Sequence, residues 1–254
     1  MTGRISAAFV SLGLLVGATG CISFVEIPVE IPLQAKLDVS AFQRVLVAGF
    51  LAGGSKSIDP NSETARLLRS QLRTKSDMRV VDADVISLAD EVDRMRGRQI
   101  PTGTNRDEPK IKTAKDLEDY EQIFSDKEYW KKLGSQYQNP LIVTGTVLFT
   151  EVQKSGMVSK AQAYTDQVTG EQKFQEVKTM SEMKGYALDA KFTFIDGRTG
   201  AELHSETIHD ESLYPSTQNT PALSSYFEIM DKILPSFLNT LSTQKIRGTR
   251  ILIK

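Results

Sequence analysis

Apolar residues are grouped along the chain in patterns that predict alternating strands and helices. Residues 44–50 (RVLVAGF) form a nearly continuous apolar run, which is typical of a central strand buried on both faces. Residues 62–75 place their apolar side chains on one helical face, and Asn61 or Ser62 is available as the N-cap. Residues 78–81 follow as a second strand. This order predicts a right-handed βαβ unit with parallel strands.

The middle of the chain predicts short helices around a polar loop. Periodic apolar residues predict helices over 84–96, 114–124 and 126–137. The segment 97–113 is polar and contains Pro101, Gly103 and Pro109, so it is predicted to be an exposed loop. We therefore expect 98–138 to form a polar loop and helical insertion.

The C-terminal half predicts a strand, a hairpin and a long helix. Residues 141–152 begin as a buried strand. Residues 184–196 alternate clearly, and a turn leads from them into a partner strand over 201–210, which predicts a long antiparallel hairpin. A wide apolar face predicts a helix over 221–243, and residues 250–253 (RILI) predict a short closing strand.

The segment 153–183 lacks a continuous apolar face. Lysine, glutamine and glutamate recur at both odd and even positions, so neither side of a strand here would be tolerated by lipid. We therefore predict a soluble hairpin or mobile flap over these residues.

The first 21 residues resemble the signal peptide of bacterial lipoproteins. Arg4 supplies a positive region, residues 5–16 form an apolar run, and Ala18-Thr19-Gly20-Cys21 resembles a lipobox. The resemblance implies cleavage after residue 20 and lipidation of Cys21, which would become the mature N-terminus. An ordinary secretory peptide cut nearby, or a buried structural cysteine, is the alternative interpretation.

The mature N-terminus is predicted to be extended. In residues 22–41, Pro28 and Pro32 remove backbone donors and disfavour helical dihedrals in the residues before them. A stiff tether and an edge strand carrying prolines are both consistent with this pattern. The predicted organisation is a signal peptide (1–20), a lipidated cysteine with its tether (21–41), and a single α/β domain (42–254).

Composition and charge are those of an exported globular protein without a nucleic-acid partner. The chain is 40% apolar and 25% charged, with a formal net charge of −1, so polyanion binding is disfavoured. Cys21 is the only cysteine, so no disulfide forms within the chain. Roughly 230 residues remain after the predicted cleavage, which is enough to bury a core without covalent cross-links.

Candidate chemical motifs are weak. Gly49 to Ser57 lies between a strand and a helix, but Ser55 separates the glycine from Lys56, so the phosphate-binding loop register is wrong. His204 and His209 are the only histidines, and positions five apart on a strand face opposite sides, so a shared metal site is not predicted. We predict no catalytic residue, no cofactor and no metal ligand.

A group of basic residues flanks the predicted loop. Its members are Arg94, Arg96, Arg98, Arg106, Lys110 and Lys112. Such a group would favour an anionic lipid surface or peptidoglycan, but nearby acidic residues dilute it, and a solvated loop is the preferred interpretation.

Several phrases together resemble one family of bacterial envelope lipoproteins. They are LDVSAFQRVLVAGF (37–50), SETARLLRSQL (62–72), MRVV (78–81), NPLIVTGTV (139–147) and YALDAKFTFIDGRTGAELHSE (186–206). With the lipobox, they resemble the periplasmic domain shared by the curli lipoprotein CsgG, the Pel lipoprotein PelC, the activator LpoB and the N-terminal domain of TolB. The resemblance covers about 40–150 and 184–254. It implies a mixed sheet flanked by helices, of the anticodon-binding-domain-like type, without catalytic residues.

The leading functional hypothesis is an assembly module of an envelope machine for secretion, polysaccharide export or motility. The expected location is the outer membrane, facing the periplasm, because Ile22 rather than aspartate follows the lipidated cysteine. The expected partners are the membrane, through Cys21, other envelope proteins, and a second copy of the chain, as in the ring-forming relatives. The alternative is a periplasmic enzyme acting on cell-wall or surface glycan.

Overall fold

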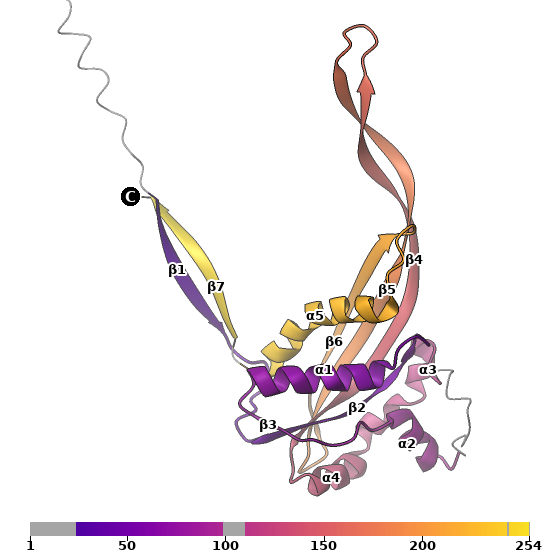
Figure 1. Cartoon of the computed structure of the whole chain (residues 1–254). Helices are drawn as coiled ribbons and strands as arrows, with labels where there is room; N and C mark the ends of the chain where they lie inside the picture. The colour runs from indigo at the N-terminus through magenta and orange to yellow at the C-terminus, as the bar shows by residue number, and fades with distance from the viewer. Residues whose placement is uncertain (1–23, 99–109, 243, 254) are drawn as a thin grey trace, which may run out of the picture. The chain divides into compact units, whose positions relative to one another are not determined.

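A computed structural model describes residues 24–98, 110–242 and 244–253, and the chain divides into two compact units (Figure 1). One unit comprises Met1–Gln34 with Thr243–Lys254, and the other comprises Ala35–Ser242. The predicted signal peptide and Cys21 lie outside the described residues.

The first unit contains a two-stranded antiparallel sheet built from both ends of the chain. Strand β1 (Phe24–Leu33) pairs with β7 (Gln244–Ile253) in a continuous register, from Phe24 opposite Ile253 to Leu33 opposite Gln244. The prolines in β1 are compatible with this arrangement because each strand of a two-stranded sheet has an open edge. The extended conformation agrees with the sequence pattern, but the pairing of β1 with the chain's end was not predicted.

The second unit is a mixed five-stranded sheet covered by helices on both faces, as the sequence predicted. Its strands, in the order β3-β2-β4-β5-β6, are β3 (Arg79–Val80), β2 (Arg44–Gly54), β4 (Leu141–Thr165), β5 (Gln172–Asp196) and β6 (Glu202–Pro215). Strand β2 pairs in parallel with β3 and β4, and β5 pairs antiparallel with β4 and β6. The predicted βαβ unit and the predicted hairpin are therefore both present.

The helices form the two outer layers of this unit. They are α1 (Pro60–Lys75), α2 (Leu88–Met95), α3 (Ala114–Glu118), the 3-10 helix η1 (Glu121–Ser125), α4 (Lys127–Gln136) and α5 (Ala222–Leu241). Helices α1 and α5 share one apolar core with the sheet, while α2, α3, η1 and α4 share a second core on the other face. None of the helices in the described ranges combines the length and apolar character that a membrane crossing requires.

Two predicted helix boundaries are wrong for identifiable reasons. Helix α1 is capped by Asp59, whose side chain accepts from the Asn61 backbone N–H, rather than by Asn61 or Ser62. Helix α2 begins only at Leu88, not at residue 84, because the Ile86 N–H donates to the Ala48 carbonyl at 2.8 Å and keeps the preceding residues extended.

The hairpin strands are much longer than the sequence predicted. Strand β4 continues to Thr165 rather than ending at residue 152, and β5 begins at Gln172 rather than at 184. The segment 153–183 therefore forms a hairpin, one of the two predicted alternatives, and it directly continues the core strands β4 and β5. Its polar residues hid this extension, because alternation of apolar residues marks only the part of a strand that faces a core.

Candidate functional site: the arm and the pocket at its root

A two-stranded arm extends from the sheet, and we define it as residues 155–182 (Figure 1). The ladder between β2 and β4 ends at Phe149, and the ladder between β5 and β6 ends at Met183. Beyond these points β4 and β5 pair only with each other among the described residues, from Ser155–Glu182 to Thr165–Gln172. The arm therefore has two open strand edges and no covering helix.

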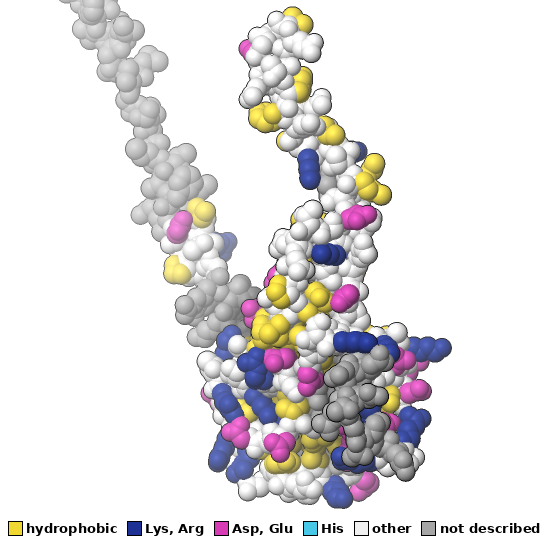
Figure 2. Space-filling view, turned by 45° about the vertical axis from the view of Figure 1, so that its right-hand side comes forward, with side chains coloured by type: hydrophobic (Ala, Val, Ile, Leu, Met, Phe, Trp, Pro, Cys, Tyr) yellow, Lys and Arg dark blue, Asp and Glu magenta, His cyan; other side chains and the backbone are white. Residues whose placement is uncertain are grey.

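The arm exposes large apolar side chains. Met157 is 75% exposed, Met180 73% and Phe174 73%. Met157 lies opposite Met180, and Phe174 lies opposite Ala163, so strand alternation places all four on one side of the ribbon. We call this side, with Ala161, the apolar face; Figure 2 shows separate apolar patches along the arm. Among the described residues, no core covers these side chains, so they make this side of the arm a candidate contact surface.

The apolar face is not uniform, and the arm as a whole is not strongly charged. Lys178 and Glu176 occupy the same side of the ribbon between the methionines and Phe174. Tyr164, 43% exposed, lies at a position of the opposite parity. Mixed charges of this kind fit a protein surface better than a polyanion.

The tip of the arm is held by a local hydrogen-bond network. The Asp166 carboxylate accepts from the Val168 backbone N–H at 2.9 Å and from Lys173 Nζ at 2.5 Å. These interactions, led by the Lys173 contact, hold the pKa of Asp166 below its ordinary value. Gly170 has φ of +71°, which a glycine adopts without strain. The turn is thus locally specified although nothing packs over it.

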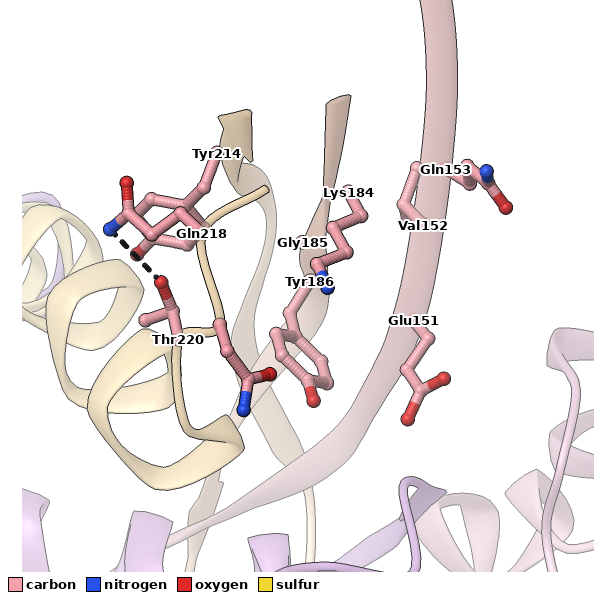
Figure 3. A pocket seen from close by; sticks show the side chains of 10 residues that line it. Glu151, Val152, Gln153, Lys184, Gly185, Tyr186, Tyr214, Gln218 and Thr220 are labelled. Carbon is pink, nitrogen blue, oxygen red and sulfur yellow. Dashed lines mark hydrogen bonds between the residues drawn. The ribbon is translucent and has the colours of Figure 1, made fainter. Parts of the chain in front are cut away.

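A pocket of about 430 Å³ lies at the root of the arm (Figure 3). Its lining residues are Glu151, Val152, Gln153, Lys184, Gly185, Tyr186, Tyr214, Gln218, Asn219 and Thr220. They come from β4, β5, the end of β6 and the segment before α5. Gln153 lies opposite Lys184, and Glu151 lies opposite Tyr186. By strand alternation these four residues are on the same side of β4 and β5 as the apolar face of the arm.

The aromatic wall of the pocket is supported from below. The Tyr186 ring stacks on Phe149 with centroids 4.8 Å apart, and Phe149 meets the buried Tyr226 edge-on at 5.3 Å. The Tyr214 hydroxyl donates to the Glu228 carboxylate, which also accepts from Ser212 at 2.9 Å. The hydrogen bond from Tyr214 is the larger cause, and the one from Ser212 the next, of a pKa for Glu228 that lies below its ordinary value. The Tyr186 and Tyr214 side chains are therefore both held in place by neighbouring residues.

Several polar groups of the pocket have no protein partner in the described part of the chain. These are the Glu151 carboxylate, the Lys184 ammonium, the Tyr186 hydroxyl and the Gln153 and Asn219 amides, none of which makes a hydrogen bond or ion pair there. Neighbouring charges outside the pocket are paired, for example Lys154 with Glu211 at 2.5 Å. Burial is the larger cause, and the negative charge of Glu151 the smaller one, of a raised pKa for Tyr186. The Tyr186 hydroxyl therefore stays protonated and can donate a hydrogen bond.

The glycine-rich segment considered as a phosphate loop instead packs tightly against other backbone. A Cβ on Gly49 would lie 2.2 Å from the Ile86 carbonyl oxygen. The Gly54 N–H donates to the Ile111 carbonyl, and the Asn61 side chain accepts from the Phe50 N–H at 2.7 Å. The backbone groups at both ends of this loop are thus already used within the fold.

The two histidines occupy separate environments, as their spacing predicted. His209 Nδ1 lies 2.6 Å from the Asp189 carboxylate, whereas the His204 ring stacks on Phe194 at 6.0 Å. Across the described ranges, no group of three histidine, cysteine, aspartate or glutamate side chains is arranged to hold a metal ion.

The basic residues near the polar loop are largely engaged in ion pairs. Lys110 contacts Asp90 at 2.7 Å and Asp93 at 2.6 Å, while Arg98 contacts Asp93 at 3.5 Å. Arg94 pairs with Glu91. These contacts disfavour a basic surface for anionic lipid. Arg106 lies outside the described residues.

Comparison with known proteins gives limited information. No protein-family model matches the chain, and no curated protein matches it. Among solved structures, the lipoprotein GNA1162 from Neisseria meningitidis is 14% identical, with a TM-score of 0.32. The match covers 77% of this chain and 98% of the Neisseria chain. A putative neuraminyllactose-binding hemagglutinin homolog from Helicobacter pylori is 10% identical, with a TM-score of 0.36, covering 82% and 87%. TM-scores this low do not establish a shared fold, so the function must be inferred from the residues of this chain.

Proposed function

We propose that the protein is a lipid-anchored, non-catalytic component of the bacterial envelope whose arm binds another envelope protein. The observation that carries the proposal is the apolar face of the arm, with Met157, Phe174 and Met180 exposed on one side. An isolated two-stranded hairpin is only marginally stable in water, so a partner that covers this face would also stabilise it. The expected partner surface is apolar with a polar rim.

The envelope setting rests on the N-terminal pattern and on the CsgG-like phrases in the sequence. Both favour an assembly role in a secretion, polysaccharide-export or motility apparatus of the outer membrane. The arm supplies the contact element that such a role requires. A second copy of the chain is included among the partners that this proposal allows.

The anchor is tested by replacing Cys21 with serine. The unmodified chain is expected to fractionate with membranes and to incorporate labelled fatty acid, because two or more acyl chains give stable attachment whereas one binds only marginally. C21S is expected to lose both properties. Retention of C21S in the membrane fraction, with no label in either form, would contradict lipid anchoring.

The arm is tested by site-specific photo-crosslinking of the full chain in native membranes. A crosslinker at Met157 or Phe174 is expected to give one defined product. A crosslinker at Gln162, on the opposite side of the ribbon, is expected to give about tenfold less. A product of twice the mass of the mature chain would identify a second copy as the partner.

A matched pair of variants separates binding from folding. Serine at Met157, Phe174 and Met180 should reduce crosslinking from position 163 at least about tenfold, since buried anchor residues dominate interface energy. Serine at Gln162 and Gln175, which face the other side, should leave it unchanged. Equal yields from both sides of the ribbon, or full yield from the triple variant, would exclude the apolar face as the contact.

A further inference from the structure

The pocket at the root of the arm has the chemistry of a ligand site distinct from the apolar face. Its lining combines two tyrosines with amides and a hydroxyl, and its two charged residues, Glu151 and Lys184, are of opposite sign. A volume of about 430 Å³ lies within the range of small-molecule sites, about 300–1,000 Å³. In Figure 3 the Glu151 and Lys184 side chains lie near the Tyr186 ring, whereas the Gln153 side chain points away from it.

This combination selects among ligand classes. A phosphate or other polyanion would meet the Glu151 carboxylate with only Lys184 to offset it. A wholly apolar ligand would leave the polar groups of Glu151, Gln153 and Lys184 desolvated without partners, which costs free energy. An uncharged ligand rich in hydroxyl and amide groups would satisfy them, because amide and carboxylate side chains together offer both donors and acceptors.

We propose that the pocket binds a short, uncharged glycan segment containing N-acetylated sugars. The C–H face of a sugar ring would lie on the Tyr186 ring, which is amphipathic and already stacked on Phe149. Glu151 and Lys184 would bond the hydroxyls, and Gln218 or Asn219 would bond the acetamido group. The inference does not depend on the arm's partner.

The structure favours binding rather than hydrolysis. Glycosidases use a pair of carboxylates on either side of the scissile bond. Glu151 is the one carboxylate among the residues that line the pocket. The positions of two side chains are also fixed in advance, since Glu228 holds Tyr214 and Thr220 holds the Gln218 amide at 3.2 Å. Preorganised side chains lower the entropic cost of binding.

The test is ligand-observed NMR and calorimetry with the purified full chain in detergent, using chitotriose and maltotriose as probes and trialanine as a peptide comparison. Saturable chitotriose binding is expected, with maltotriose weaker because it lacks the acetamido group. Trialanine is expected not to compete. Glu151→Gln and Gln218→Ala, both at exposed positions, should each weaken chitotriose binding at least about fivefold.

Matched variants outside the pocket provide the control. Gln175→Ala on the arm should leave chitotriose affinity unchanged. Tyr186→Ala should abolish binding, and circular dichroism will show whether its fold is retained; the two polar variants decide the question if it is not. Absence of saturable chitotriose binding, competition by trialanine, or wild-type affinity in both E151Q and Q218A would each overturn the proposal.

Discussion

Replacing Gly145 with alanine is expected to lower the free energy of unfolding by about 3 kcal/mol or more. Gly145 lies near the start of β4 with φ of +142°, a conformation that residues with a side chain rarely adopt. A Cβ there would lie 1.8 Å from the Lys191 carbonyl oxygen and 3.2 Å from the Phe192 Cα. Both neighbours are backbone of β5, so no rotation of a side chain relieves the contact. Urea denaturation of the full chain, followed by far-ultraviolet circular dichroism, measures the loss.

The same strand provides the control. Gly156 also lies on β4, but nothing is within 4 Å of a Cβ built on it. Gly156→Ala should therefore change the free energy of unfolding by no more than about 0.5 kcal/mol. If the two substitutions have equal effects, the close approach of β4 and β5 at Gly145 is not what requires glycine there.

Replacing Trp130 with alanine is expected to cost about 3–5 kcal/mol, as for other fully buried aromatic residues. Trp130 is fully buried, its ring stacks on Phe124 at 6.4 Å, and it meets Tyr129 edge-on at 5.0 Å. Its Nε1–H donates to the Ile123 carbonyl at 2.8 Å, which holds η1 against α4. The loss is measured in the same denaturation experiment.

A second substitution at Trp130 separates the causes of this loss, and an exposed aromatic residue serves as the control. Trp130→Phe keeps most apolar contacts but leaves the Ile123 carbonyl without its donor, so a smaller loss of about 1–3 kcal/mol is expected. Phe174→Ala removes an aromatic ring that is 73% exposed on the arm and should cost under about 0.5 kcal/mol. A large effect of Phe174→Ala on the purified protein would mean that the ring is covered, either within one chain or by a second copy.

The central strands were predictable because burial leaves a direct record in sequence, although their order in the sheet was not predicted. Strands β2 and the first half of β4 lie between two layers of helices, so most of their positions are buried and the apolar residues in them form recognisable runs. The sequence also contains the correct start of α1, although Asn61 or Ser62 was predicted as the N-cap. Asp59 followed by Pro60 places a capping side chain directly before a proline in the first helical turn.

The arm and the pocket were not predictable in the same way, because both depend on strand register. Glu151 and Tyr186 are opposite each other across β4 and β5, and Lys184 is opposite Tyr214 across β5 and β6. These residues are far apart in sequence, and no local pattern fixes which pairs meet. The apolar face of the arm is likewise assembled from two strands, each of which contributes only a few apolar residues.

The pairing of β1 with β7 has a consequence for the order in which the protein is completed. Within the larger unit, the Leu37 N–H donates to the Thr240 carbonyl at 3.0 Å, so the segments leading to the two strands leave that unit from adjacent points. Folding of the larger unit therefore raises the effective concentration of one strand for the other, much as a short linker would. Strand β1 is synthesised before β7. It therefore remains without its partner until β7 has been made, so pairing of the two strands marks a chain that has been synthesised through β7 and in which the larger unit has folded.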